Sequence, residues 1–179
     1  MPHYRRVHHP GGTYFTTHTL LQRRGSRLLV DHIDTLRRVA QKVRMSHPFT
    51  IHAWVVLPEH LHCIIELPDG ETSSATRWRL IKACFSRSLP DVEARSVVRR
   101  SRLERGIWQR RFWEHLITDD RDYAAHMDYI HFNPVKHGCV KRVADWPYST
   151  FARCVQRDLY PLDWAGGSDP DLVTDPYDV

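Results

Sequence analysis

The sequence predicts an α+β fold in which helices pack on an antiparallel sheet. Residues 13–20 are rich in aromatic and β-branched side chains, a composition typical of strands. Apolar residues recur at spacings of three and four after residue 28, which indicates an amphipathic helix. Pro58 and Glu59 separate two further strand-like runs and favour a tight turn between them.

The first half of the chain therefore predicts one strand, one helix and one hairpin. Residues 13–20 form the first strand, and the apolar positions from Leu29 to Val43 mark a helix that ends near residue 46. Residues 49–57 and 60–67 form the hairpin.

A two-residue loop fixes the register of this hairpin. It places His60 across from Leu57 and His62 across from Val55. The same register puts His52 on the other surface of the sheet, opposite Ile65, which makes His52 a poor metal ligand beside the other two histidines.

Basic residues follow the hairpin. A second helix is predicted around Trp78, Ile81 and Phe85, with Arg77, Arg79 and Lys82 among its exposed positions. Residues 90–106 are rich in arginine and lack periodicity, so we expect a loop that orders on a ligand. Residues 107–117 predict the fourth strand.

A third helix follows the cap residues 118–120. Its apolar stripe is Tyr123, Met127 and Ile130, whereas a second strip carries Asp122, His126, Tyr129 and Asn133. Pro134 disfavours the helical conformation at Asn133, so the helix is expected to bend or end there.

Composition narrows the class of protein. The 179 residues carry a net charge of +5, which favours a polyanionic partner, although basic runs are also common on ordinary surfaces. The four cysteines form no Cys-x-x-Cys pair, and no stretch suits a membrane span or a signal peptide. We expect a cytoplasmic protein with one domain over residues 1–155 and a loosely held acidic tail over residues 156–179.

Four side chains suggest a catalytic centre. His60 and His62 alternate on one strand and point to one face, while Tyr129 and Asn133 lie one above the other on a helix. Two imidazoles and an amide oxygen suit a divalent ion with open positions, and a phenol beside them suits attack on a phosphodiester. Taken singly, each has a structural alternative: a chance His-x-His pair, a packing tyrosine and a helix-ending asparagine.

Five blocks in order resemble the REP-associated tyrosine transposases, which are single-strand transposases of the HUH endonuclease class. The blocks are residues 11–13, 53–63, 107–115, 128–138 and 145–151. The resemblance implies a ferredoxin-like βαββαβ sheet that carries the two histidines. It also implies that His60, His62 and Asn133 bind Mg²⁺ or Mn²⁺ and that Tyr129 attacks DNA. His126 is a candidate for proton transfer, and Glu59 for a role in supporting the metal site.

The implied reaction is metal-dependent nicking and rejoining of single-stranded REP-type DNA hairpins through a 5′-phosphotyrosyl intermediate. The resemblance leans towards a monomer, with a dimer as the alternative, acting in the bacterial cytoplasm on the nucleoid. The candidate DNA-binding residues are basic: Arg5, Arg6, Arg77, Arg79, Lys82, Arg110 and Arg111. Two alternatives stay open, a non-catalytic hairpin-binding regulator and a protein that acts on RNA.

Overall fold

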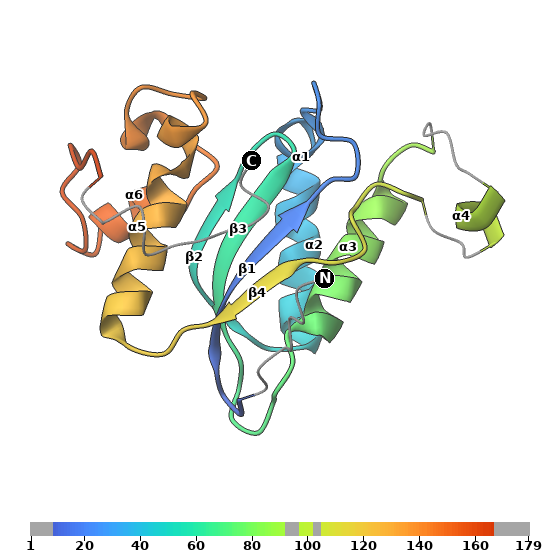
Figure 1. Ribbon diagram of the computed structural model, residues 1–179, viewed down its shortest axis with the longest axis horizontal. Helices are drawn as coiled ribbons and strands as arrows, with labels where there is room; N and C mark the ends of the chain where they lie inside the picture. The colour runs from blue at the N-terminus through green and yellow to red at the C-terminus, as the bar shows by residue number, and fades with distance from the viewer. Residues whose placement is uncertain (1–8, 92–96, 102–104, 167–179) are drawn as a thin grey trace, which may run out of the picture.

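The molecule is built around a four-stranded antiparallel sheet. The computed structural model describes residues 9–91, 97–101 and 105–166. Its strands are β1 (Thr13–Thr19), β2 (Thr50–Val56), β3 (His60–Glu66) and β4 (Trp113–Leu116), in the order β2-β3-β1-β4 (Figure 1). This is the order of a ferredoxin-like βαββαβ unit, so the predicted fold class is confirmed.

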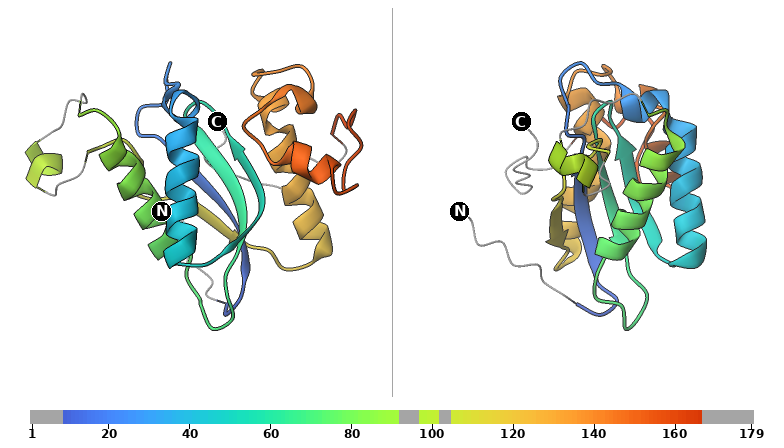
Figure 2. Two further views of the ribbon diagram at one scale, coloured as in Figure 1. Left: turned by 180° about the vertical axis from the view of Figure 1, so that it is seen from behind. Right: turned by 90° about the vertical axis from the view of Figure 1, so that its right-hand side faces the viewer.

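Helices cover both faces of the sheet. The helical elements are α1 (Leu28–Asp31), α2 (Ile33–Ser46), α3 (Ala75–Ser88), α4 (Val97–Ser101), α5 (Asp120–Lys136), η1 (Val143–Asp145) and α6 (Phe151–Val155). Helices α2 and α3 lie side by side on one face, while α5 packs on the other (Figure 2). Among the described residues no helix is long and apolar enough to cross a membrane.

Two hydrophobic cores lie on either side of the sheet. The core under α2 and α3 contains Leu61 of β3 with Leu36 and Trp78 of the helices. The core under α5 contains Ile64 of β3 with Ile130 of the helix. Strand β3 lies between β2 and β1 and is buried on both faces. The polar side chains of His60 and His62 on this strand are therefore held away from water.

The hairpin register agrees with the prediction at the site and departs from it further along. Val55 pairs with His62, and the Leu57 amide donates to the His60 carbonyl at 2.9 Å. A bulge between Ile51 and Ala53 then shifts the ladder, so Ile51 rather than His52 pairs with Ile65. The prediction for His52 is wrong, because one extra residue changes the face to which the side chain points.

The bulge gives His52 a structural role. Its Nδ1 lies 3.0 Å from the Tyr123 hydroxyl on α5, and its Nε2 lies 2.9 Å from Glu66. Both ring nitrogens are thus engaged on the α5 face, and His52 remains a poor metal ligand.

Three other boundaries differ from the prediction. The first helix breaks at His32, whose φ of −116° is not helical, and the Leu29 amide donates to the Pro58 carbonyl and ties α1 to the hairpin. The fourth strand is shorter, since only an isolated bridge from Leu20 to Trp108 precedes β4. Part of the predicted 90–106 loop forms α4, while residues 92–96 and 102–104 lie outside the described residues.

Helix α5 continues past Pro134 to Lys136, so of the two predicted outcomes at Asn133 the helix does not end there, and the bend stays a prediction. Proline removes one donor and crowds the preceding turn, but the next turn is still closed. The His137 amide donates to the Asn133 carbonyl at 3.0 Å, and the Cys139 amide donates to the Pro134 carbonyl at 2.9 Å.

The segment after α5 covers the open edge of β2. The Trp146 indole donates to the Val56 carbonyl, and the Val56 amide donates to the Tyr148 carbonyl. Further on, Tyr160 donates to Asp128 of α5 at 2.5 Å. The described part of the tail, residues 156–166, thus contacts the body, and residues 167–179 lie outside the description. The domain boundary at residue 155 stays a prediction.

We predict that Leu61→Ala destabilises the fold by about 2–5 kcal/mol, because it empties a fully buried site between the two histidines. Urea unfolding followed by circular dichroism measures this change. Leu162, whose residue is 67% exposed, offers the matched control, and Leu162→Ala should stay within about 0.5 kcal/mol of the parent. Equal effects of the two variants would contradict the core assignment.

Candidate active site

The two histidines of β3 face helix α5 together. His60 and His62 alternate with Leu61, which points into the opposite core. Their exposed fractions are 1% and 0%, and their ring centroids are 4.9 Å apart. A paired set of imidazoles is thus enclosed between the sheet and the helix.

Neighbouring side chains orient each imidazole. The Thr17 hydroxyl of β1 lies 2.8 Å from His62 Nδ1, and a Glu59 carboxylate oxygen lies 3.1 Å from His60 Nδ1. Partners on Nδ1 direct metal binding to Nε2, the arrangement common in metal-binding histidines. His60 Nε2 is buried and has no hydrogen-bond partner among the described residues.

Glu59 is held as an ion beside His60. Burial by itself raises the pKa of Glu59, but the hydrogen bond and the charge of His60 outweigh burial and leave the pKa below its ordinary value. The contact agrees with the predicted position of Glu59 beside the candidate metal site; its role stays a prediction.

Helix α5 brings Tyr129 to the same place. The Tyr129 ring lies edge-on to His62, with centroids 5.3 Å apart, and it also contacts Phe15 of β1. Lys136, nearly two turns later, places its ammonium 5.0 Å from the centre of the Tyr129 ring.

Asn133 lies between two contacts of the helix with the histidine pair. Tyr129 contacts His62, and His137, eight residues later, has its ring 5.0 Å from His60. Residues four apart share one helical face, so the helical repeat puts Asn133 on the face of α5 that carries these contacts. Asn133 is 0% exposed, and neither its Oδ1 nor its Nδ2 has a partner in the described part of the chain.

This donor set fits a divalent cation. Buried polar atoms without a partner are rare in proteins, and a bound ion or water is one way to satisfy them. The amide oxygen suits Mg²⁺ and Mn²⁺, and of these two ions Mn²⁺ tolerates imidazole nitrogens better. The site can therefore hold an ion beside a phenol.

His126 occupies a different position. Its Nδ1 lies 2.9 Å from the carbonyl of Asp122, and its ring stacks on His115 with centroids 4.7 Å apart. Burial lowers the pKa of His126, so the ring stays neutral near pH 7. These contacts favour a structural role for His126, which links α5 to His115, rather than the predicted role in proton transfer.

The predicted DNA-binding residues are dispersed over the structure. Arg77 is only 2% exposed and donates to the Pro48 carbonyl, so the prediction that it is exposed is wrong. Its side chain reaches from α3 to the segment before β2 and pairs there with Glu71. Arg5 and Arg6 lie outside the described residues.

One groove is lined by three of the predicted residues, Arg79, Lys82 and Arg110. Arg111, the next residue in the chain, is exposed. The groove has a volume of about 550 Å³ and includes the rings of Trp108 and Phe112. The Lys82 ammonium lies 5.5 Å from the centre of each of these rings. Positive charge and aromatic surface meet there.

Sequence reasoning missed a second basic groove, which adjoins His60. It is lined by Arg23, Arg24 and Arg27 together with Glu59 and His137. Two signals in the sequence could have revealed it: three arginines within five residues, and a histidine four residues after Asn133.

Comparisons with known proteins agree on one family. No family model matches the chain. The REP-associated tyrosine transposase of Escherichia coli K12 is 49% identical over 93% of this chain and 92% of its own length. A Haemophilus influenzae relative described by the same family name is 45% identical over 94% of this chain and 96% of its own length.

A solved structure extends the likeness to three dimensions. The structure of a REP-associated tyrosine transposase bound to a REP hairpin superposes with a TM-score of 0.81 at 47% identity, covering 98% of both chains. At this identity and coverage, the chain and these relatives are similar along nearly their whole length. The chain belongs to the REP-associated tyrosine transposase family.

Proposed function

We propose that this protein binds REP-type DNA hairpins and nicks and rejoins their single-stranded flanks through Tyr129, in a reaction that requires a divalent metal ion. The contact of the Tyr129 ring with His62 carries the proposal, because it joins a nucleophile to a buried set of metal ligands. Family membership and the hairpin bound to a related structure support the choice of substrate.

His60 Nε2, His62 Nε2 and Asn133 Oδ1 would hold Mg²⁺ or Mn²⁺. The ion, when bound, would neutralise a non-bridging phosphate oxygen and favour departure of the 3′-oxygen. Thr17 and Glu59 keep the two imidazoles in the orientation that directs Nε2 to the ion.

The phenolic oxygen of Tyr129 attacks the phosphorus of the scissile phosphodiester. A bond forms between that oxygen and phosphorus as the phenol proton passes to water, and the bond from phosphorus to the 3′-oxygen breaks as that oxygen takes up a proton from water. The products are a 5′-phosphotyrosyl enzyme and a free 3′-hydroxyl, so the phosphodiester energy is kept for rejoining. Lys136, beside the ring, attracts the phosphate.

Two basic grooves are candidates for binding the DNA. Arg79, Lys82 and Arg110 line the one beside α3, where Trp108 and Phe112 offer stacking surfaces for bases. Arg23 and Arg27 line the other, which reaches His137 and Glu59 at the histidine pair. We infer that the protein acts as a monomer in the cytoplasm at the nucleoid, where its hairpin substrate lies.

Tyr129→Phe should reduce the covalent protein–DNA adduct by about 1,000-fold or more, because it removes the attacking oxygen and keeps the ring against His62. A labelled hairpin oligonucleotide with Mn²⁺ and a denaturing gel measures the adduct. Tyr148→Phe, a change in a tyrosine at the β2 edge, should leave adduct formation unchanged. An adduct that persists in Tyr129→Phe would assign the nucleophile elsewhere.

His60→Ala should abolish cleavage and leave hairpin affinity within about threefold, because the metal acts on the reacting phosphate and basic side chains supply the affinity. Gel shift and cleavage assays on the same samples separate the two properties. His32→Ala, at the break between α1 and α2, provides the matched control. Cleavage that is insensitive to His60→Ala would refute the metal site, and binding by the parent without cleavage would favour a regulator.

Arg79→Ala should weaken hairpin binding and lower the slope of log K against log salt by about one, because one phosphate contact is lost. Filter binding across a salt series measures the slope, with matched DNA and RNA hairpins to test for a preference. Arg142→Ala is the control, since Arg142 is exposed and pairs with Asp145. Identical slopes for Arg79→Ala and the parent would exclude that groove from the DNA path.

A further inference from the structure

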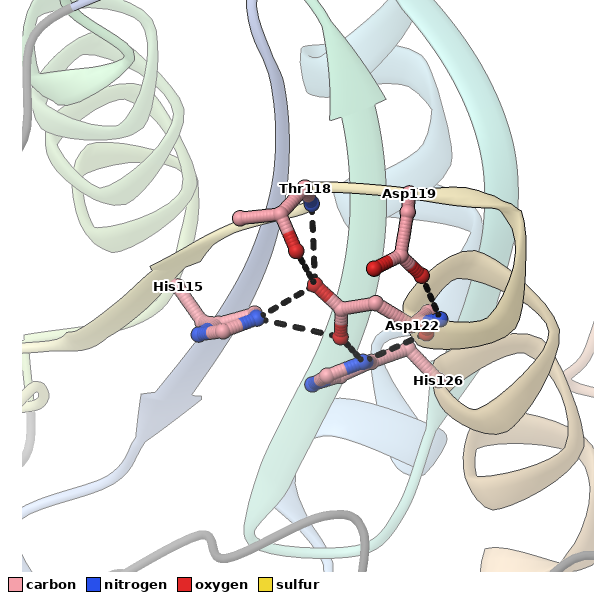
Figure 3. A network of polar contacts seen from close by, with 5 residues as sticks. All are labelled: His115, Thr118, Asp119, Asp122 and His126. Carbon is pink, nitrogen blue, oxygen red and sulfur yellow. Dashed lines mark hydrogen bonds and ion pairs between the residues drawn. The ribbon is translucent and has the colours of Figure 1, made fainter.

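A second set of metal-ligand side chains lies outside the proposed catalytic centre. His115 of β4 and His126 of α5 flank the carboxylate of Asp122, which is in the first turn of α5 (Figure 3). One ligand atom from each of these residues lies within 4.8 Å of the other two. The set shares no residue with His60, His62 and Asn133.

The separations of the ligand atoms match those of a first-row metal site. His115 Nε2 lies 2.8 Å from Asp122 Oδ2, and His126 Nδ1 lies 2.9 Å from Asp122 Oδ1. Bonds of about 2.1 Å to a tetrahedral ion put its ligand atoms about 3.4 Å apart, about half an ångström more than these two contacts. Shifts of a few tenths of an ångström would thus admit an ion among the three residues.

The surroundings hold the carboxylate in position and leave one side open. The Thr118 amide and hydroxyl donate to Asp122 Oδ2 at 2.9 Å and 3.2 Å, and the Asp122 amide donates to Asp119 (Figure 3). The side chain of His126 is 5% exposed, whereas that of His115 is 37% exposed. An ion can therefore enter from the His115 side and keep water as a further ligand.

We propose that His115, Asp122 and His126 form a binding site for a transition-metal ion of the zinc class, separate from the catalytic metal. Two imidazoles and one carboxylate are the ligand types that Zn²⁺ and Co²⁺ accept in proteins. Without metal, ring N–H groups donate to Asp122. Binding releases these protons and puts the ion in their place.

The site joins two elements that position Tyr129. His115 belongs to the edge strand β4, while Asp122 and His126 lie in the half of α5 that leads to Tyr129. Both histidine sets contact the ring of Phe15, through His62 at 5.6 Å and His126 at 4.7 Å between centroids. A bound ion would tie the start of the helix to the sheet and stabilise the native state by mass action.

The test uses the full chain without a histidine tag and with His60→Ala and His62→Ala in place, so that the proposed catalytic site is silenced. After chelator treatment, calorimetric titration with Zn²⁺ should show one equivalent bound, and Co²⁺ should give a visible ligand-field spectrum. Zn²⁺ should also raise the Tm of this protein.

Asp122→Asn and His126→Gln, each added to this parent, should weaken Zn²⁺ binding at least about tenfold and remove the Co²⁺ spectrum. His47→Ala, at the end of α2, should leave both unchanged. His115→Gln serves as a third variant if the two others fail to fold by circular dichroism, because His115 is the most exposed ligand.

No Zn²⁺ binding by the parent, or equal binding by the folded ligand variants, would overturn the proposal. The assay contains no DNA and needs no turnover. An absence of Zn²⁺ binding would not contradict the proposed reaction at Tyr129. An absence of that reaction would not contradict the proposed zinc site.

Discussion

The site depends on the enclosure of two imidazoles on the central strand β3. Because β3 is paired on both edges and covered on both faces, His60 and His62 cannot turn to water. A buried imidazole needs partners for both ring nitrogens, and here Thr17 and Glu59 meet one nitrogen of each ring. These contacts fix the orientation of both rings, so the strand holds the proposed ligand nitrogens in set directions, and the cores around β3 offset the cost of burying polar groups.

Helix α5 is held by contacts that keep its polar strip on these histidines. Ile130 fits the core with Ile64, which sets the rotation of the helix. At its start the Asp119 side chain caps the helix, and Tyr160 holds Asp128 on the next strip around. Since one residue of slip rotates a helix by about 100°, this packing decides whether Tyr129 meets His62 or faces away.

Local signals in the sequence were enough to predict the parts of the fold that rest on local chemistry. The Pro58-Glu59 turn fixed the pairing of Val55 with His62, and the cap before α5 fixed the strip that carries Tyr129. The bulge at His52 was not predictable from local signals, and the Tyr123 hydroxyl that His52 contacts there lies 71 positions later in the chain. Arg77 likewise looked exposed by periodicity, yet tertiary partners bury it.

Helix α5 contacts the sheet through residues in both of its halves, and the helical repeat explains this too. A helix that carries a nucleophile in its middle places the residues four and eight positions later along one line, and here that line ends at His137 beside His60. Nearer the start of the helix, the same polar strip brings His126 to His115 on β4, so the helix contacts the sheet at both its centre and its edge. Rigid elements therefore fix every candidate ligand, whereas the arginines of both grooves lie largely on loops or exposed faces. Rigid ligands and mobile basic side chains suit an enzyme that must hold its reacting atoms in place while its DNA-binding residues adjust to DNA of variable sequence.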